Sequence, residues 1–219
     1  MKNPYRWLIY GLGMAVLALG ISLNTKTGLG VSPIISVAYC VSQIFSLNFG
    51  DMTFLLYVLF VVVQLFLRDK TERVATLLQI VVSLIFSRLL NLCDALIPYS
   101  SVEHGLPANL ILLAVAIFLT GLGVAMTVNM RLVPNPGDGI VQAIAEKIGR
   151  DQGFTKNVFD IGCVCVTVIL GFCFAGHVVG IGIGTIAAMV GVGRAIALVN
   201  HFYKDKMLAA AGMAGQGKA

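Results

Sequence analysis

Charged residues are scarce in this chain of 219 residues, of which only 11% are Asp, Glu, Lys or Arg. A soluble globular domain carries about 25% charged residues, so the composition excludes a soluble protein. Hydrophobic residues make up 58% of the chain, and the mean hydropathy is +0.92. The apolar residues form long blocks such as Leu110–Met130. A helix of about 20 apolar residues matches the roughly 30 Å hydrocarbon layer of a bilayer. The sequence therefore predicts a membrane protein with several spanning helices.

Motifs for catalysis, nucleotide binding and metal binding are also lacking. The five cysteines lie inside apolar blocks, and Cys163 and Cys165 face different directions on a helix because they are two residues apart. With no hydrolase motif, phosphate loop or thiol pair, we expect neither an enzyme nor a protein that binds a cofactor or metal. The net charge of +5 does not indicate a nucleic-acid partner, because the basic residues cluster at the ends of apolar blocks.

Six apolar blocks are long enough to cross a bilayer, and two shorter helical segments lie among them. The shorter segments, Pro33–Leu47 and Pro136–Arg150, each begin with proline, which suits the first turn of a helix. About 15 helical residues extend only about 22 Å, too short to span comfortably. Irregular glycine-rich chain precedes both segments, so each is expected to be a re-entrant half-helix covered by protein or a watery cavity. The six predicted spans are Trp7–Asn24, Met52–Leu67, Val74–Ile97, Asn109–Met130, Lys156–Gly176 and Val178–Phe202.

An internal repeat relates the two halves of the chain. A shift of 103 residues aligns Pro33 with Pro136 without a gap. With three further residues inserted before the last span, Arg88 aligns with Arg194. Each half therefore reads as span, half-helix, span, span. The predicted division is a first repeat of residues 1–104, a second repeat of residues 105–206, and a small, polar tail of residues 207–219 that is expected to be disordered.

The positive-inside rule indicates whether the two repeats are parallel or inverted. If the half-helices are re-entrant, twelve of the fifteen Lys and Arg residues lie on the cytoplasmic side, whereas only eight do if every helix spans. The first arrangement is favoured, and it gives each repeat three crossings, which makes the repeats inverted. The predicted fold class is an all-α polytopic membrane protein with six transmembrane helices plus two re-entrant half-helices in two inverted repeats. Both termini are expected to be cytoplasmic.

The half-helix starts are the first candidates for a binding site. Transporters built from inverted repeats and broken helices hold their substrate near the midplane, where the repeats meet. The starts at Ser32-Pro33 and Asn135-Pro136 should meet there. Each would offer unpaired N–H groups and the positive end of a helix dipole, which suit an anion or a polar oxygen. Simple helix initiation is the alternative explanation of both prolines.

Two arginines are the second feature that indicates a site. Arg88 and Arg194 fall near mid-bilayer, where a charge costs roughly 2.5–3.5 kcal/mol on insertion scales. They either contact substrate or bind backbone carbonyls or an internal carboxylate such as Asp138. Asp138 in turn caps its own half-helix, pairs with an arginine or takes up a proton. Together these features favour a small anionic or zwitterionic solute. The candidate substrate-binding residues are Ser32, Pro33, Arg88, Asn129, Asn135, Pro136, Gly137, Asp138, Gly139, Thr185 and Arg194.

Three short motifs resemble the YczE/YyaS/YitT-type family of bacterial integral membrane proteins. They are Gly28-Leu29-Gly30-Val31-Ser32-Pro33, Pro136-Gly137-Asp138-Gly139-Ile140, and Gly182-Ile183-Gly184-Thr185-Ile186 followed by Gly191. The similarity covers most of the chain, although Ile34 and Ile35 stand where the family pattern has a tryptophan and a polar residue. The resemblance implies the bacterial cytoplasmic membrane and a transport role.

The prediction from sequence is a secondary transporter or facilitator of a small anionic or zwitterionic solute in the bacterial inner membrane. Two alternatives stay open, a channel-like pore and a non-transporting membrane scaffold or accessory subunit. The expected partners are the solute and the lipid bilayer, with a homodimer as an open option and no nucleic acid.

Overall fold

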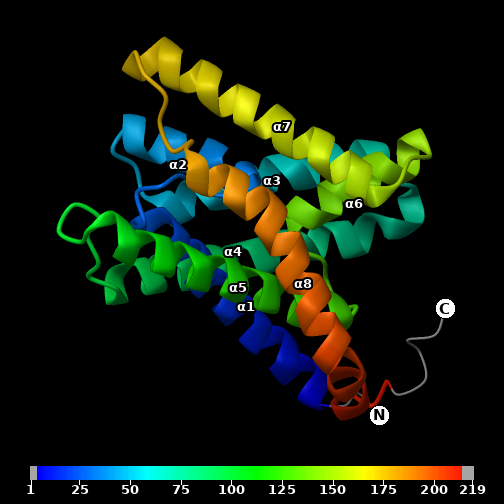
Figure 1. The fold of residues 1–219 in the computed structure, drawn as a ribbon. Helices are drawn as coiled ribbons and strands as arrows, with labels where there is room; N and C mark the ends of the chain where they lie inside the picture. Colours follow the sequence, from blue (N-terminus) through cyan, green and yellow to red (C-terminus); the bar gives the residue numbers. More distant parts are fainter. Residues whose placement is uncertain (1–3, 214–219) are drawn as a thin grey trace.

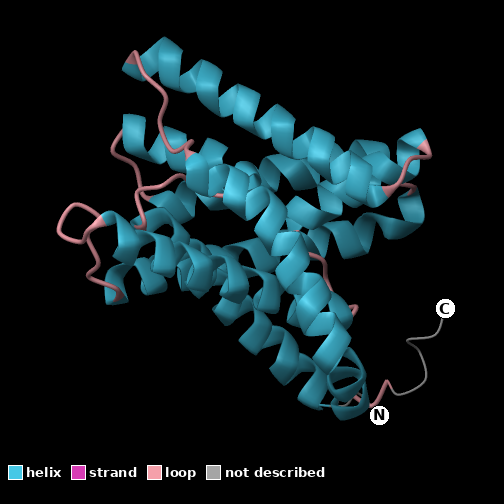
Figure 2. Ribbon diagram, in the orientation of Figure 1, coloured by secondary structure: helices cyan, strands magenta, loops and turns pink. Residues whose placement is uncertain are grey.

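The computed structural model describes residues 4–213, and within that range the chain is helical without strands (Figures 1 and 2). Six helices are long and apolar enough to cross a membrane. They are α1 (Pro4–Lys26), α3 (Phe49–Leu67), α4 (Arg73–Leu96), α5 (Leu106–Asn129), α7 (Gln152–Leu170, extended by the π-turn Gly171–Ala175) and α8 (Ile183–Ala210). The remaining elements are the short helices α2 (Pro33–Ile44) and α6 (Pro136–Ile148) and the 3₁₀ turn Lys70–Glu72. The six-span, all-helical prediction is confirmed.

Local sequence explains where the helices begin. Pro33 and Pro136 occupy the first turns of α2 and α6, where a missing N–H costs nothing. The helices that follow them have matching N-caps. Asn48 Oδ1 accepts a hydrogen bond of 2.9 Å from the backbone N–H of Asp51, and Asp151 Oδ2 accepts one of 3.0 Å from Phe154. Each short helix is therefore followed by a capped turn that starts the next long helix.

The most extensive helix packing in the described residues is between α1 and α5, which lie side by side and approach closely at two glycines (Figure 1). A Cβ on Gly20 would lie 2.6 Å from the backbone nitrogen of Thr120. A Cβ on Gly123 would lie 2.5 Å from the backbone nitrogen of Leu17. Only glycine allows the two backbones to approach this closely, as is common where small residues line helix contacts in membranes.

The other helices pack in corresponding pairs. Helix α4 packs on α1, and α8 packs on α5; α2 packs on α7, and α6 packs on α3. The contact of α2 with α7 includes a hydrogen bond of 2.7 Å between the hydroxyls of Ser36 and Thr167. The correspondence fails at one place. Helices α3 and α4 pack extensively, but over the described residues α7 and α8 do not, and Figure 1 shows them diverging from the loop that joins them.

The C-terminal segment differs from the prediction of a disordered tail from residue 207. Helix α8 continues to Ala210, and Leu208, Ala211 and Met213 are buried in a cluster with Tyr10 and Met130. These apolar side chains cover the start of α1 and the end of α5, which is why the chain stays ordered here. Residues 214–219 lie outside the described residues.

Candidate functional site: a polar cavity between two helix starts

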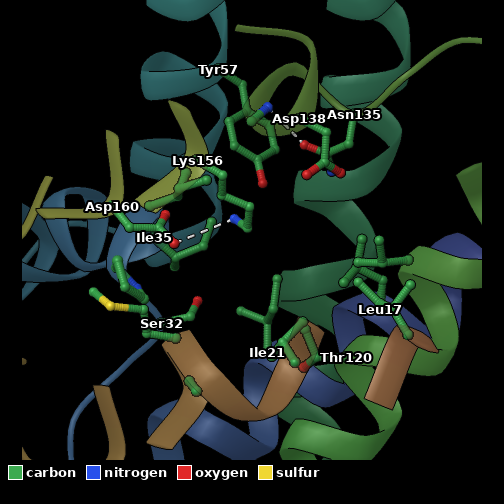
Figure 3. A pocket seen from close by; sticks show the side chains of 18 residues that line it. Leu17, Ile21, Ser32, Ile35, Tyr57, Thr120, Asn135, Asp138, Lys156 and Asp160 are labelled. Carbon is green, nitrogen blue, oxygen red and sulfur yellow. Dashed lines mark hydrogen bonds and ion pairs between the residues drawn. The ribbon is translucent and has the colours of Figure 1, made fainter. Parts of the chain in front are cut away.

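A cavity of about 100 Å³ lies where the starts of α2 and α6 approach each other (Figure 3). Helices α1, α3, α5, α7 and α8 supply the rest of its wall, so all but one of the long helices contribute. Much of the lining is apolar, and the polar side chains come from a few positions. They are Ser32, Tyr57, Thr120, Asn135, Asp138, Lys156 and Asp160.

The start of α2 presents unpaired backbone N–H groups to the cavity. Ser32 is its N-cap, but the Ser32 side chain makes no capping hydrogen bond. The first helical hydrogen bond runs from the N–H of Ser36 to the carbonyl of Ser32. The amides of Ile34 and Ile35 precede that bond, and both residues line the cavity. This helix start therefore offers N–H donors at the positive end of the α2 dipole.

The start of α6 is arranged differently, because Asn135 accepts hydrogen bonds from the backbone N–H groups of its first turn. Asn135 Oδ1 accepts a hydrogen bond of 3.0 Å from the N–H of Gly137. The carbonyl of Asn135 accepts from the N–H groups of Asp138 and Gly139, at 3.0 and 2.8 Å. Asn135, not Asp138, is thus the cap of α6. The Asp138 carboxylate is left to line the cavity, where Figure 3 shows it beside Asn135 and close to Tyr57.

Lys156 and Asp160 form an ion pair on α7 at the opposite side of the cavity (Figure 3). Lys156 Nζ lies 3.5 Å from Asp160 Oδ2, and the two side chains are 39% and 3% exposed. Asp160 Oδ1 is buried without a hydrogen-bond partner. The Asp138 carboxylate lines the same cavity, so two acidic groups and one basic group share a space that is lined largely by apolar side chains.

Sequence reasoning missed Lys156, Asp160 and Tyr57 as site residues. The signal that could have found the first two is their spacing of four residues, which puts a Lys and an Asp on one face of an otherwise apolar helix. The offset of 103 residues also relates Tyr57 to Asp160, so either residue would have indicated the other. Both line the cavity.

The two predicted arginines lie outside the cavity. Arg88 is on the surface of α4, with its side chain 60% exposed, and its Nη1 lies 3.1 Å from Asp51 Oδ1. Arg194 is exposed on α8, whereas its neighbours Val192 and Ile196 line the cavity. Positions two residues away point to the opposite side of a helix, so Arg194 faces away from the site.

The remaining predicted residues are divided between the cavity and its surroundings. Pro33 and Gly137 line it, together with Ser32, Asn135 and Asp138. Gly139 packs behind it against the paired amides of Gln64 and Gln79, and the Pro136 carbonyl accepts a hydrogen bond of 3.5 Å from Gln64 Nε2. Two further candidates lie elsewhere. Asn129 donates to Asn200 at 2.7 Å, and Thr185 accepts from the Gly182 N–H at 3.2 Å.

A second pocket lies beyond the start of α2, and the chain between the two is tightly closed. This outer pocket of about 530 Å³ is lined by residues including Thr25, Gln43 and His177, and it shares no lining residue with the cavity. Two backbone hydrogen bonds tie the segments between them, from Val31 N–H to the Gly180 carbonyl at 2.9 Å and from Gly184 N–H to the Leu29 carbonyl at 2.7 Å.

Comparison with known proteins identifies relatives but no activity. The sequence model of a family described as "Family of unknown function (DUF6198)" matches residues 4–201. "Uncharacterized membrane protein YczE" of Bacillus subtilis (strain 168) is 27% identical over 157 residues, 71% of this chain and 70% of that protein. "Uncharacterized protein YyaS" of the same organism is 25% identical over 181 residues, 83% of this chain and 85% of that protein. No solved structure matches.

Proposed function

Since the chain belongs to the DUF6198 family of membrane proteins of unknown function, we propose that it is a secondary transporter or facilitator of a small zwitterionic solute. The observation that carries the proposal is the meeting of the α2 and α6 starts at one cavity inside a bundle of six apolar helices. Broken helices that face a central site are the arrangement by which many secondary transporters hold their substrate.

The lining of the cavity supports two repeats related by a pseudo-two-fold axis that passes through the site. Positions 103 residues apart face the same space from opposite sides, so each half of the chain contributes an equivalent part of the wall. The pairs are Leu17 and Thr120, Ile21 and Val124, Ser32 and Asn135, Ile34 and Gly137, Ile35 and Asp138, and Tyr57 and Asp160.

Contacts at the helix ends support inverted repeats with re-entrant half-helices. The ends of α1 and α2 line one pocket through Thr25 and Gln43, and Phe45 contacts Phe174 with ring centroids 5.6 Å apart. Helix α2 would therefore return to the face where α1 ended, and its 12 residues extend only about 18 Å. The start of α1 lies by the end of α5, because Arg6 donates to the Met130 carbonyl at 2.7 Å. The excess of basic residues at this second face supports cytoplasmic termini in the bacterial inner membrane.

The unequal packing of the two halves supports alternating access instead of an open channel. Tyr57 on α3 stacks on Phe86 of α4, with ring centroids 5.9 Å apart. Their repeat equivalents, Asp160 on α7 and Val192 on α8, are separated by the cavity instead. One side of the axis is thus closed and the other open. Exchanging these arrangements between the halves would close α7 on α8 and open α3 from α4, exposing the same site to the other face.

The charges around the cavity favour a zwitterion over a simple anion. The anionic prediction depended partly on Arg88 and Arg194, which both lie outside the cavity. What remains for a negative group is the set of N–H donors at the start of α2 and the cationic Lys156. The carboxylates of Asp138 and Asp160 face the same space and would repel an anion that carries no positive group.

Solute flux into proteoliposomes tests this proposal against the channel and scaffold alternatives. We would measure uptake of radiolabelled glycine, acetate and methylammonium, three probes of similar size that carry both charges, the negative one or the positive one. The expected result is glycine uptake that saturates and is accelerated by glycine inside the vesicles. Uptake that stays proportional to solute concentration would establish a channel. If no zwitterion in a wider panel entered the vesicles faster than it enters empty liposomes, the non-transporting scaffold would be favoured.

A further inference from the structure

The central cavity holds more negative than positive groups. Asp138 and Asp160 both line it, and Lys156 is the one basic residue in its described lining. Lys156 is already bound to Asp160 through the contact of 3.5 Å. A carboxylate without a counter-ion in a low-dielectric space is costly, so such a group binds a cation or takes up a proton.

The protein supplies the Asp138 carboxylate with no donor of its own. Within residues 4–213, no side-chain hydrogen bond or ion pair reaches it, because Asn135 caps α6 and Lys156 pairs with Asp160. Asp160 is similarly incomplete, since its Oδ1 is buried without a partner although the side chain is 3% exposed. Two carboxylates that line one cavity thus both have unused acceptor atoms.

We propose that Asp138 is the subsite for a protonated amine of the transported solute, with Asp160 holding Lys156 on the far side of the cavity. This inference rests on the proposed transport function and names the cationic half of its substrate. The amine would donate charge-assisted hydrogen bonds to Asp138. The solute carboxylate would lie toward the N–H groups of Ile34 and Ile35 at the start of α2.

The rest of the wall favours an organic amine over a metal ion. Val192, Met189 and Ile196 of α8 face the carboxylates across the cavity. These side chains offer hydrocarbon contact to the carbon part of a solute, and they bring no oxygen ligands. A small metal ion held in a protein takes about six oxygen ligands, whereas the cavity offers two carboxylates, and Asp160 already holds Lys156.

Binding to the purified protein tests the subsite independently of transport. Thermal unfolding in detergent would be followed with methylammonium, glycine, acetate and sodium chloride at equal ionic strength. Glycine and methylammonium should raise the midpoint in a saturable way, because a ligand bound only by the folded state stabilises it. Sodium chloride and acetate should not. Stabilisation by sodium equal to that by methylammonium would overturn the proposal in favour of a metal site.

Matched variants test whether the Asp138 carboxylate binds the amine. Asp138→Asn should weaken glycine binding by roughly tenfold or more, since a hydrogen bond to a charged group is worth about 1.5–3 kcal/mol. Asp205→Asn, the same change at an exposed carboxylate that does not line the cavity, should leave glycine binding unaltered. Asp138→Glu keeps the charge and should retain methylammonium binding, which guards against misfolding of the Asn variant. Unchanged amine binding in a folded Asp138→Asn protein would show that a proton neutralises Asp138, and the proposal would fail.

The two proposals fail in different ways. If methylammonium binds through Asp138 but no solute crosses the bilayer, the amine subsite stands and the transport function falls. If glycine is transported and Asp138→Asn leaves its KM unchanged, transport stands and the amine subsite falls.

Discussion

Asp160 lies two turns into α7, four residues after Lys156. Its carboxylate is almost fully buried and holds Lys156, the basic residue that lines the cavity. Because Asp160 is 3% exposed and Lys156 is 39% exposed, removing Lys156 leaves a buried carboxylate unpaired, whereas removing Asp160 leaves an ammonium group that water can reach. The stability of the site is therefore most sensitive to single substitutions at this pair.

A double-mutant cycle at this pair makes that argument measurable. Lys156→Met is expected to lower the free energy of unfolding by about 1–3 kcal/mol, because the buried Asp160 carboxylate loses its partner. Asp160→Asn added to Lys156→Met should recover part of the loss. Chemical unfolding of the four proteins in detergent gives the coupling energy. Strictly additive losses would mean that the two side chains do not interact.

At the scale of elements, the position of α6 depends on a contact with α3 and α4. Gln64 and Gln79 exchange amide hydrogen bonds of 3.1 and 3.0 Å, and both side chains are buried. Gly139 lies against this pair, and Gln64 also donates to the carbonyl of Pro136. The amide pair thus holds the first turn of α6 where Asn135 and Asp138 reach the cavity.

Gly139→Ala tests how closely α6 must approach this amide pair. The new Cβ would lie 2.7 Å from Gln64 Oε1 and 3.0 Å from Gln79 Oε1, so the variant should lose about 1–3 kcal/mol of stability through overpacking. Gly162→Ala is the matched control, because nothing lies within 4 Å of its Cβ position in α7. The control should gain up to about 1 kcal/mol from helix propensity. Thermal unfolding of both variants and the parent protein measures these changes. A Gly139→Ala protein as stable as the parent would show that α6 can move away from the amide pair.

At the scale of the whole molecule, the two halves share their helix order but differ in packing. Asp51 and Arg88 link α3 to α4 at 3.1 Å, whereas the repeat equivalents Phe154 and Arg194 are both exposed and lie on the separated helices α7 and α8. Helices that pack in one half and separate in the other are what two alternating conformations of an inverted-repeat transporter would require.

Cross-linking tests whether this difference is exchanged during transport. In a background without the five native cysteines, Asp51→Cys with Arg88→Cys should react with a short bifunctional thiol reagent and stop glycine counterflow by holding α3 on α4. Phe154→Cys with Arg194→Cys should cross-link slowly at rest and faster with saturating glycine, as α7 closes on α8. Reducing a cleavable linker should restore flux. Full counterflow with the first pair cross-linked would rule out this movement.

Composition and periodicity by themselves predicted the membrane class, the six spans and the two short helices, and the resemblance of three short motifs indicated the family. These features depend on local sequence, because the thickness of the hydrocarbon layer sets the length of a span. Proline favours the first turn of a helix whatever the tertiary structure. Sequence patterns also identified Ser32, Pro33, Asn135, Gly137 and Asp138, since the repeat marks both helix starts. The prediction of disorder was wrong for residues 207–213, because the burial of Leu208 and Met213 depends on helices distant in sequence.

Only the tertiary structure decided which charges meet. In the sequence, Arg88 and Lys156 are both charges in or beside an apolar span. In the structure, Arg88 lies on the surface beside Asp51. Lys156 lies in the cavity beside Asp160. The direction that a helix faces depends on its packing against neighbours, and the close approach of α1 and α5 at Gly20 and Gly123 sets that packing here. The same long-range packing separates α7 from α8, and residues of both helices line the cavity.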